Sequence, residues 1–129
     1  MRDIKKVISE IESFDSNNGS WLKLDDLVSE LWEYENPEIG IDALFEIFEK
    51  NPTDDGAGVF WTILHGLETL EYEERLYESL IKKPSHMTIT MLKRIENSDS
   101  GFIAGKSISE LKSLIRSNPK IESELLNEI

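Results

Sequence analysis

The residues best suited to acid–base chemistry are the adjacent aspartates Asp54 and Asp55 and the histidine His65. Carboxylates and imidazoles transfer protons in enzymes, provided that they meet around a substrate. Adjacent residues on a helix do not face each other, so the two aspartates are poorly placed to act together. A carboxylate at a helix N-terminus accepts backbone N–H bonds and suits the helix dipole. We therefore predict that Asp54 or Asp55 is a cap, and that His65 is a partly buried, hydrogen-bonded structural residue.

Other patterns that carry catalysis or bind cofactors do not occur. The sequence has no cysteine, which excludes disulfides, thiolate metal sites and cysteine nucleophiles. The two histidines, His65 and His86, do not have a metal-binding spacing, and we expect His86 to be exposed or to cap a helix. The Gly56-Ala57-Gly58 stretch lacks the lysine of a phosphate-binding loop, and no calcium-loop pattern is found. The sequence thus predicts no catalytic residue, no metal site and no cofactor, and a protein that is not an enzyme.

The acidic residues are concentrated in one part of the chain. The formal net charge is −12, from 26 acidic and 14 basic residues. Residues 24–78 contain sixteen acids and only two bases, Lys50 and Arg75, so this segment has a net charge of −14. A negative field disfavours nucleic acid and anionic membranes as ligands, and it suits a basic protein partner. Solubility is the alternative explanation, although solubility does not require this concentration.

Two predicted helices carry the acids in stripes. In residues 21–34, three acids recur at helical spacing nearly opposite the apolar side: Asp26, Glu30 and Glu33. In residues 37–50, four acids recur on a flank of the apolar side: Glu38, Asp42, Glu46 and Glu49. Like charges four residues apart repel by a few tenths of a kcal/mol per pair. Neither stripe contains a basic partner, so each is either a binding surface or simply a solvated face.

Helical periodicity extends through the whole chain. It predicts helices over residues 2–14, 21–34, 37–50, 54–70, 72–83, 86–97, 107–117 and 119–129. Asn-Pro steps and glycines separate these segments at short turns. No strand is predicted, and the segment from Phe102 to Ala104 should tuck under the helices. We predict one all-α domain, residues 1–129, of seven to eight helices in stacked antiparallel pairs, either α-solenoid-like or an irregular helical bundle.

The segment from Asp54 to Glu74 should be the centre of this fold. Its apolar residues cover most of the circumference of a helical wheel, which predicts a helix that is buried on nearly all sides. Three glycines, Gly56, Gly58 and Gly66, predict the close approach of another backbone. The run is too short to span a membrane, and the N-terminus has no signal-peptide pattern. We expect a monomer in the cytoplasm.

The stretch GVFWTILHGLETLEYEERLYESLIKKPSHMTITMLKRIENS, residues 58–98, resembles a group of small all-helical bacterial immunity proteins of polymorphic or contact-dependent toxin systems. The resemblance covers about a third of the chain and contains no catalytic signature. It implies that the protein binds a cognate toxin in the cytoplasm and blocks its active site. Many such toxins are nucleases, and an acidic surface suits a groove built for phosphates. The predicted partner-binding residues are Asp26, Glu30, Glu33, Glu38, Asp42, Glu46, Glu49, Asp54, Asp55, Glu71, Glu73 and Glu74.

Two other hypotheses make different structural predictions. A helical-repeat adaptor without a toxin partner predicts an exposed, concave apolar strip, with acids that are incidental. A helical enzyme predicts that Asp54, Asp55 and His65 converge in one pocket. An exposed tryptophan next to an acidic stripe would instead indicate a hot spot for protein binding.

Overall fold

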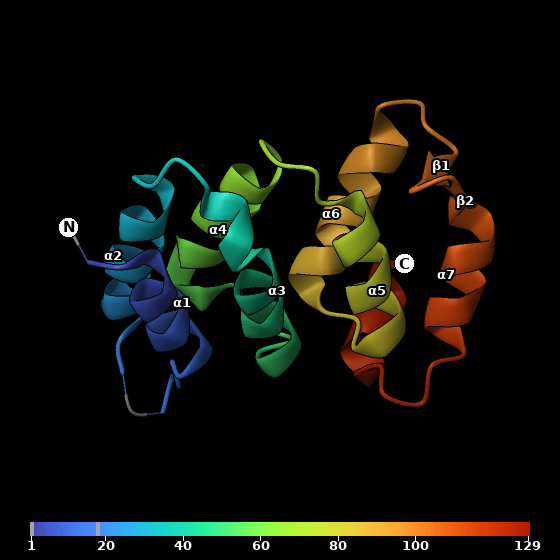
Figure 1. The fold of residues 1–129 in the computed structure, drawn as a ribbon. Helices are drawn as coiled ribbons and strands as arrows, with labels where there is room; N and C mark the ends of the chain where they lie inside the picture. Colours follow the sequence, from blue (N-terminus) through green and yellow to red (C-terminus); the bar gives the residue numbers. More distant parts are fainter. Residues whose placement is uncertain (1, 18) are drawn as a thin grey trace.

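The computed structural model describes residues 2–17 and 19–129, and within them the chain folds into seven α-helices and three 3-10 turns (Figure 1). In chain order the elements are α1 (Ile4–Glu12), α2 (Trp21–Trp32), η1 (Pro37–Gly40), α3 (Ile41–Lys50), η2 (Gly56–Gly58), α4 (Val59–Leu67), α5 (Glu73–Lys82), α6 (His86–Asn97), β1 (Phe102–Ile103), β2 (Lys106–Ser107), α7 (Ile108–Arg116) and η3 (Ser123–Glu128). The predicted all-α class is confirmed.

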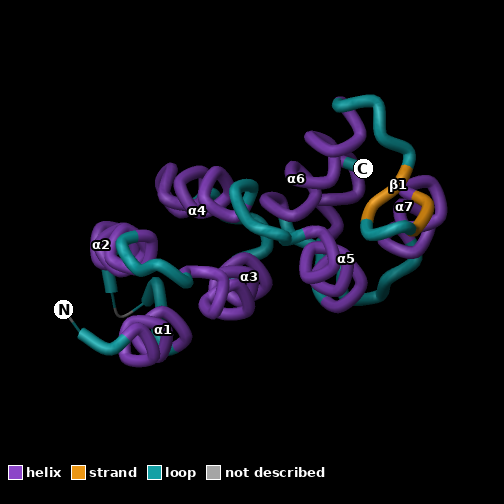
Figure 2. The backbone as a smooth tube through the Cα atoms, turned by 45° about the horizontal axis from the view of Figure 1, so that its top comes forward, coloured by secondary structure: helices purple, strands orange, loops and turns teal. Residues whose placement is uncertain are grey.

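The helices form two layers. Helices α1, α3, α5 and α7 follow one another side by side in one layer, and α2, α4 and α6 do so in the other (Figure 2). Each helix of the second layer follows its neighbour in the first after a short connection, which gives the stacked pairs that the sequence predicts. The buried apolar side chains form one cluster that extends from Val7 in α1 to Leu125 in η3.

Side-chain caps begin several of these helices where the sequence places Ser or Asp. Ser20 accepts a hydrogen bond from the Lys23 backbone N–H at 3.3 Å and starts α2. Ser85 starts α6 with a reciprocal capping box, in which its Oγ accepts from the Thr88 N–H at 3.1 Å. These bonds satisfy donors that a helix leaves free at its first turn. They explain why α6 has the bounds that periodicity predicts.

The central helix is shorter and less buried than predicted. Residues Gly56, Ala57 and Gly58 all have positive φ, at 61°, 54° and 93°. A right-handed helix cannot pass through this conformation, so α4 begins only at Val59. One side of α4 faces solvent, as the 37% exposure of Trp61 shows. The prediction of a helix buried on nearly all sides is therefore wrong.

The segment from Phe102 to Ser107, in which no strand is predicted, forms a small β-hairpin. Phe102 pairs with Ser107 and Ile103 with Lys106 in an antiparallel arrangement. The turn residues Ala104 and Gly105 both have positive φ, at 50° and 76°, as a tight two-residue hairpin turn requires. Ile103 is buried, as the predicted tucked segment requires, whereas Phe102 is 62% exposed.

No helix in the described part of the chain combines the length and the apolar character needed to cross a membrane.

The C-terminal segment was predicted to be a helix from residue 119, but it forms the 3-10 turn η3. Pro37–Gly40 is likewise a 3-10 turn before α3, so the predicted helix over residues 37–50 begins in a tighter form.

Candidate binding surface

Asp54 and Asp55 lie at the start of η2 and act as local caps. The Asp54 carboxylate accepts a hydrogen bond from the Gly56 N–H at 2.8 Å, and the Asp55 carboxylate accepts one from the Ala57 N–H at 3.1 Å. Asp55 therefore caps the 3-10 turn η2, whereas α4 begins after Gly58 without a side-chain cap, so the prediction that one of these aspartates caps the central helix is wrong. His65 lies six positions after Val59 in α4, or about 9 Å along the helix axis, and both aspartates precede Val59. The three side chains therefore do not converge as the enzyme hypothesis requires.

His65 is exposed rather than partly buried, because it lies on the solvent side of α4. Its side chain is 62% exposed, and its Nδ1 is 3.9 Å from a carboxylate oxygen of Glu68. Its ring lies 6.1 Å from the ring of Trp61, centroid to centroid. The prediction of a structural histidine is wrong at this position. His86 was predicted to be exposed or to cap a helix. It is half-buried at the first position of α6, which Ser85 caps, and its Nδ1 lies 2.6 Å from Glu128 Oε1.

The acidic stripe of α2 divides into paired and unpaired residues. Glu30 accepts two hydrogen bonds from the Arg2 guanidinium, at 2.8 and 3.0 Å. These bonds hold the pKa of the Glu30 carboxyl below its usual range. Asp26 and Glu33 are exposed, and no ion pair involves either of them within the described residues.

The acidic stripe of α3 faces α5, where it meets Arg75. Arg75 donates to Asp42 at 2.8 Å and to Glu49 at 3.2 Å, and it lies over the Phe45 ring. Glu49 also accepts from the Ser79 hydroxyl at 2.8 Å and pairs with Lys82. Its side chain is only 8% exposed. Glu49 therefore joins α3 to α5 and is bound within the fold, and its role as a partner-binding residue stays a prediction.

These contacts fix the register between α3 and α5. Asp42 lies beside Arg75, and Glu49 lies beside Lys82, so the two helices run in the same direction with a constant offset. Because the offset is constant, acids at helical spacing from these contacts, and acids in the turns just before the two helices, follow the α3–α5 junction. We call this surface the α3–α5 acidic face: Glu38, Asp42, Glu46, Glu71, Glu74 and Glu78.

Most of the α3–α5 acidic face lacks a basic partner. Within residues 2–17 and 19–129, only Asp42 of these six acids forms an ion pair. Five of the six belong to the predicted partner-binding residues, whereas Glu78 does not. Its signal in the sequence is its position seven residues after Glu71 and four after Glu74, which is one side of a helix.

The two predicted stripes do not form one surface, because α2 and α3 belong to different layers (Figure 2). Asp26 and Glu33 lie on α2, whereas Asp42 and Glu46 lie on α3 and join the acids of α5. A single partner surface therefore does not follow from helical spacing alone. The layer that contains α3 and α5 carries the larger group of unpaired acids.

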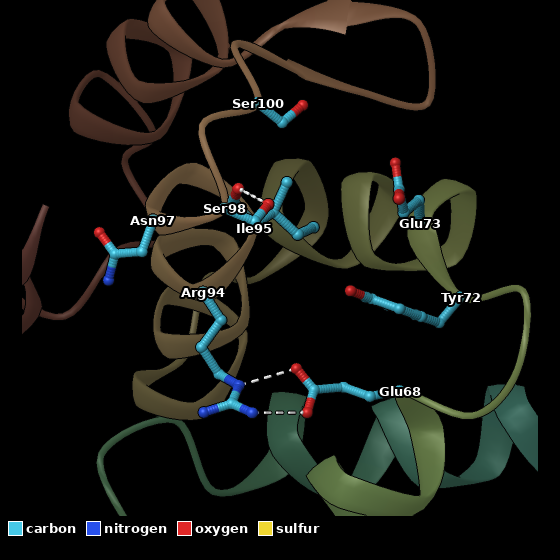
Figure 3. A pocket seen from close by; sticks show the side chains of 8 residues that line it. All are labelled: Glu68, Tyr72, Glu73, Arg94, Ile95, Asn97, Ser98 and Ser100. Carbon is cyan, nitrogen blue, oxygen red and sulfur yellow. Dashed lines mark hydrogen bonds and ion pairs between the residues drawn. The ribbon is translucent and has the colours of Figure 1, made fainter.

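A cleft of about 580 Å³ lies where α4, α5 and α6 meet (Figure 3). Its lining residues are Glu68, Tyr72, Glu73, Arg94, Ile95, Asn97, Ser98 and Ser100. Arg94 makes two hydrogen bonds to Glu68, at 2.7 and 2.9 Å. Glu73 accepts a hydrogen bond from the Ala104 N–H at 3.0 Å. Burial, and then the charges of Glu68 and Glu73, raise the pKa of the Tyr72 hydroxyl.

In the part of the chain that the structure describes, no group of three or more His, Asp or Glu side chains is placed to hold a metal ion. Comparisons with protein-family models, with curated proteins and with solved structures find no significant match to this chain. The resemblance to immunity proteins stays a prediction, and the functional argument rests on the arrangement of the charged side chains.

Proposed function

We propose that this protein binds and neutralises a basic protein toxin, as an immunity protein does, and that the α3–α5 acidic face is its docking surface. The observation that carries the proposal is that five of the six acids of this face have no basic partner within the described residues. In this proposal the protein acts as a monomer in the cytoplasm and has no catalytic activity of its own.

The distribution of the bases supports this assignment. Arg75 is the basic residue at the centre of the face, and it is 14% exposed and already bound to Asp42 and Glu49. The five other acids form no ion pair within the described residues, so direct pairing does not relieve their mutual repulsion, which costs folding free energy. A basic partner removes that repulsion when it docks, and the same field accelerates its approach.

A nuclease-like toxin is the class of partner that this charge fits best. Its substrate groove has to be basic, because it binds phosphates. The carboxylates of the α3–α5 acidic face would present negative charges to such a groove, as a nucleic acid does. Occupation of the groove would block the substrate directly.

The test of this proposal is capture of the protein encoded by the adjacent gene, measured over a series of salt concentrations. We expect tight binding whose affinity falls as salt rises, because salt screens exposed charges beyond about 10 Å at 0.1 M. Tight binding that is indifferent to salt would move the interface to apolar residues. Absence of binding at every salt concentration would contradict the proposal.

The adaptor hypothesis has less support from the structure. It predicts an exposed, concave apolar strip. The large exposed apolar side chains of the described residues each come from a different element: Leu22, Ile39, Trp61, Ile81, Phe102, Leu114 and Leu126. Trp61 is the exposed tryptophan that would suit a hot spot, but it lies on α4, in the layer opposite to the acidic face.

A further inference from the structure

The cleft between α4, α5 and α6 borders the α3–α5 acidic face. A smaller hollow at the start of α5 is lined by Glu71, Tyr72, Glu73 and Glu74. It shares Tyr72 and Glu73 with the larger cleft. Because Glu71 and Glu74 also belong to the acidic face, the face continues into a concave site around the Tyr72 ring. A partner docked on the face would therefore have this site within its reach.

The electrostatics of the cleft favour a cation. Arg94 is the basic residue that lines it, and both of its hydrogen bonds go to Glu68, so these two charges compensate each other. Glu73 uses one carboxylate oxygen for a backbone N–H, and it forms no ion pair within the described residues. Helices α4 and α6 end at the cleft and α5 begins there. The helix termini therefore contribute partial charges of both signs, and the unpaired carboxylate of Glu73 determines the preference for a cation.

Tyr72 gives the cleft an aromatic wall. Its side chain points from the start of α5 toward α6, between Glu68 and Glu73 (Figure 3). No hydrogen bond to its hydroxyl occurs within residues 2–17 and 19–129, so the phenol is free to bind a ligand. A guanidinium or ammonium group stacks favourably on a tyrosine ring, and the long aliphatic stem of arginine or lysine covers apolar surface.

We propose that the cleft receives one basic side chain, an arginine or a lysine, of the protein that docks on the α3–α5 acidic face. Tyr72 holds the stem and the cationic group by its ring, and Glu73 neutralises the charge. This inference rests on the proposed function, because the side chain belongs to the same partner. It assigns the cleft as the anchor point, whereas the acidic face supplies the longer-range attraction.

The variants Tyr72→Leu and Glu73→Gln test the anchor directly. The glutamine oxygen still accepts the Ala104 N–H, so the hairpin contact is kept. We expect each variant to weaken binding of the adjacent gene's product about tenfold, as loss of a buried anchor does, whereas Tyr72→Phe keeps most of the affinity. The matched control Asp26→Asn removes one exposed charge from α2 and should bind like the wild type.

A second measurement does not depend on the partner. In a titration followed by NMR, N-acetyl-arginine amide should shift the backbone signals of Tyr72, Glu73 and Asn97, and the uncharged citrulline analogue should not. Equal shifts at Asp26 and Glu33 would show unspecific attraction and overturn the anchor.

If the Tyr72 and Glu73 variants bind the partner normally while charge reversal at Glu38 and Glu78 abolishes binding, the anchor is wrong and the acidic-face proposal stands. If none of these changes matters, both are wrong.

Discussion

At the scale of single residues, three arginines decide which carboxylates stay available. Arg2 binds Glu30, Arg75 binds Asp42 and Glu49, and Arg94 binds Glu68. Each pair joins residues more than 25 positions apart in the chain. Spacing within one helix therefore identifies the acidic stripes but cannot show which of their members are paired.

At Gly66, packing against the Trp32 ring leaves no room for a side chain. A Cβ atom added there would lie 2.2 Å from the Trp32 ring, which is far below van der Waals contact. The indole ring is rigid, so it yields less easily than the end of a flexible side chain would. The sequence predicted the approach of a backbone at this glycine, whereas an indole ring fills the space.

We predict that Gly66→Ala lowers the free energy of unfolding by about 2 kcal/mol. Overpacking costs about 3 kcal/mol at the upper end of its usual range, and alanine regains about 1 kcal/mol of helix propensity. The control is Gly101→Ala, where nothing lies within 4 Å of the added atom, so stability should stay unchanged. Urea unfolding measures both values, provided that the slope of the unfolding free energy against urea concentration is the same in each variant and the wild type. A Gly66→Ala protein as stable as the wild type would contradict this account of the packing.

At the scale of elements, local chemistry predicted the helices well and their ends less well. The bounds of α6, His86–Asn97, follow from Ser85 and from apolar periodicity, and both signals are local. The late start of α4 depends on three consecutive residues with positive φ, one of them Ala57. Alanine rarely adopts that conformation, so the sequence gives little sign of it. The hairpin turn at Ala104-Gly105 was missed for the same reason.

Glu49 and Glu46 differ in role although both belong to the acidic stripe of α3. Glu49 joins α3 to α5 through Arg75, Ser79 and Lys82. We expect Glu49→Gln to lower the free energy of unfolding by about 2 kcal/mol, because hydrogen bonds to a charged and largely buried group are lost.

The matched control is Glu46→Gln, on the same helix and with the same change in charge. It should alter the free energy of unfolding by no more than about 0.5 kcal/mol, because Glu46 has no ion-pair partner within the described residues. Equal losses of stability in the two variants would show that Glu49 does not link the helices.

At the scale of the whole molecule, the two-layer arrangement determines which acids share a surface. It separates the stripe of α2 from that of α3 and joins the α3 stripe to the acids of α5 (Figure 2). The sequence predicted stacked helix pairs, but the neighbours across pairs depend on packing between distant segments. For this reason Glu78 was not predicted as a site residue, and the α2 stripe received the same weight as that of α3.

The most direct measurement compares two charge reversals of equal size on opposite layers. One variant carries Glu38→Lys and Glu78→Lys on the α3–α5 acidic face, and the other carries Asp26→Lys and Glu33→Lys at α2. All four acids are exposed, and none forms an ion pair within residues 2–17 and 19–129. The measured quantity is the affinity for the adjacent gene's product, by titration calorimetry at low salt.

We expect the affinity to fall at least about a hundredfold, or about 2.7 kcal/mol, in the first variant and less than about threefold in the second. Equal losses in the two variants, or a loss confined to the α2 variant, would contradict the assignment of the α3–α5 acidic face.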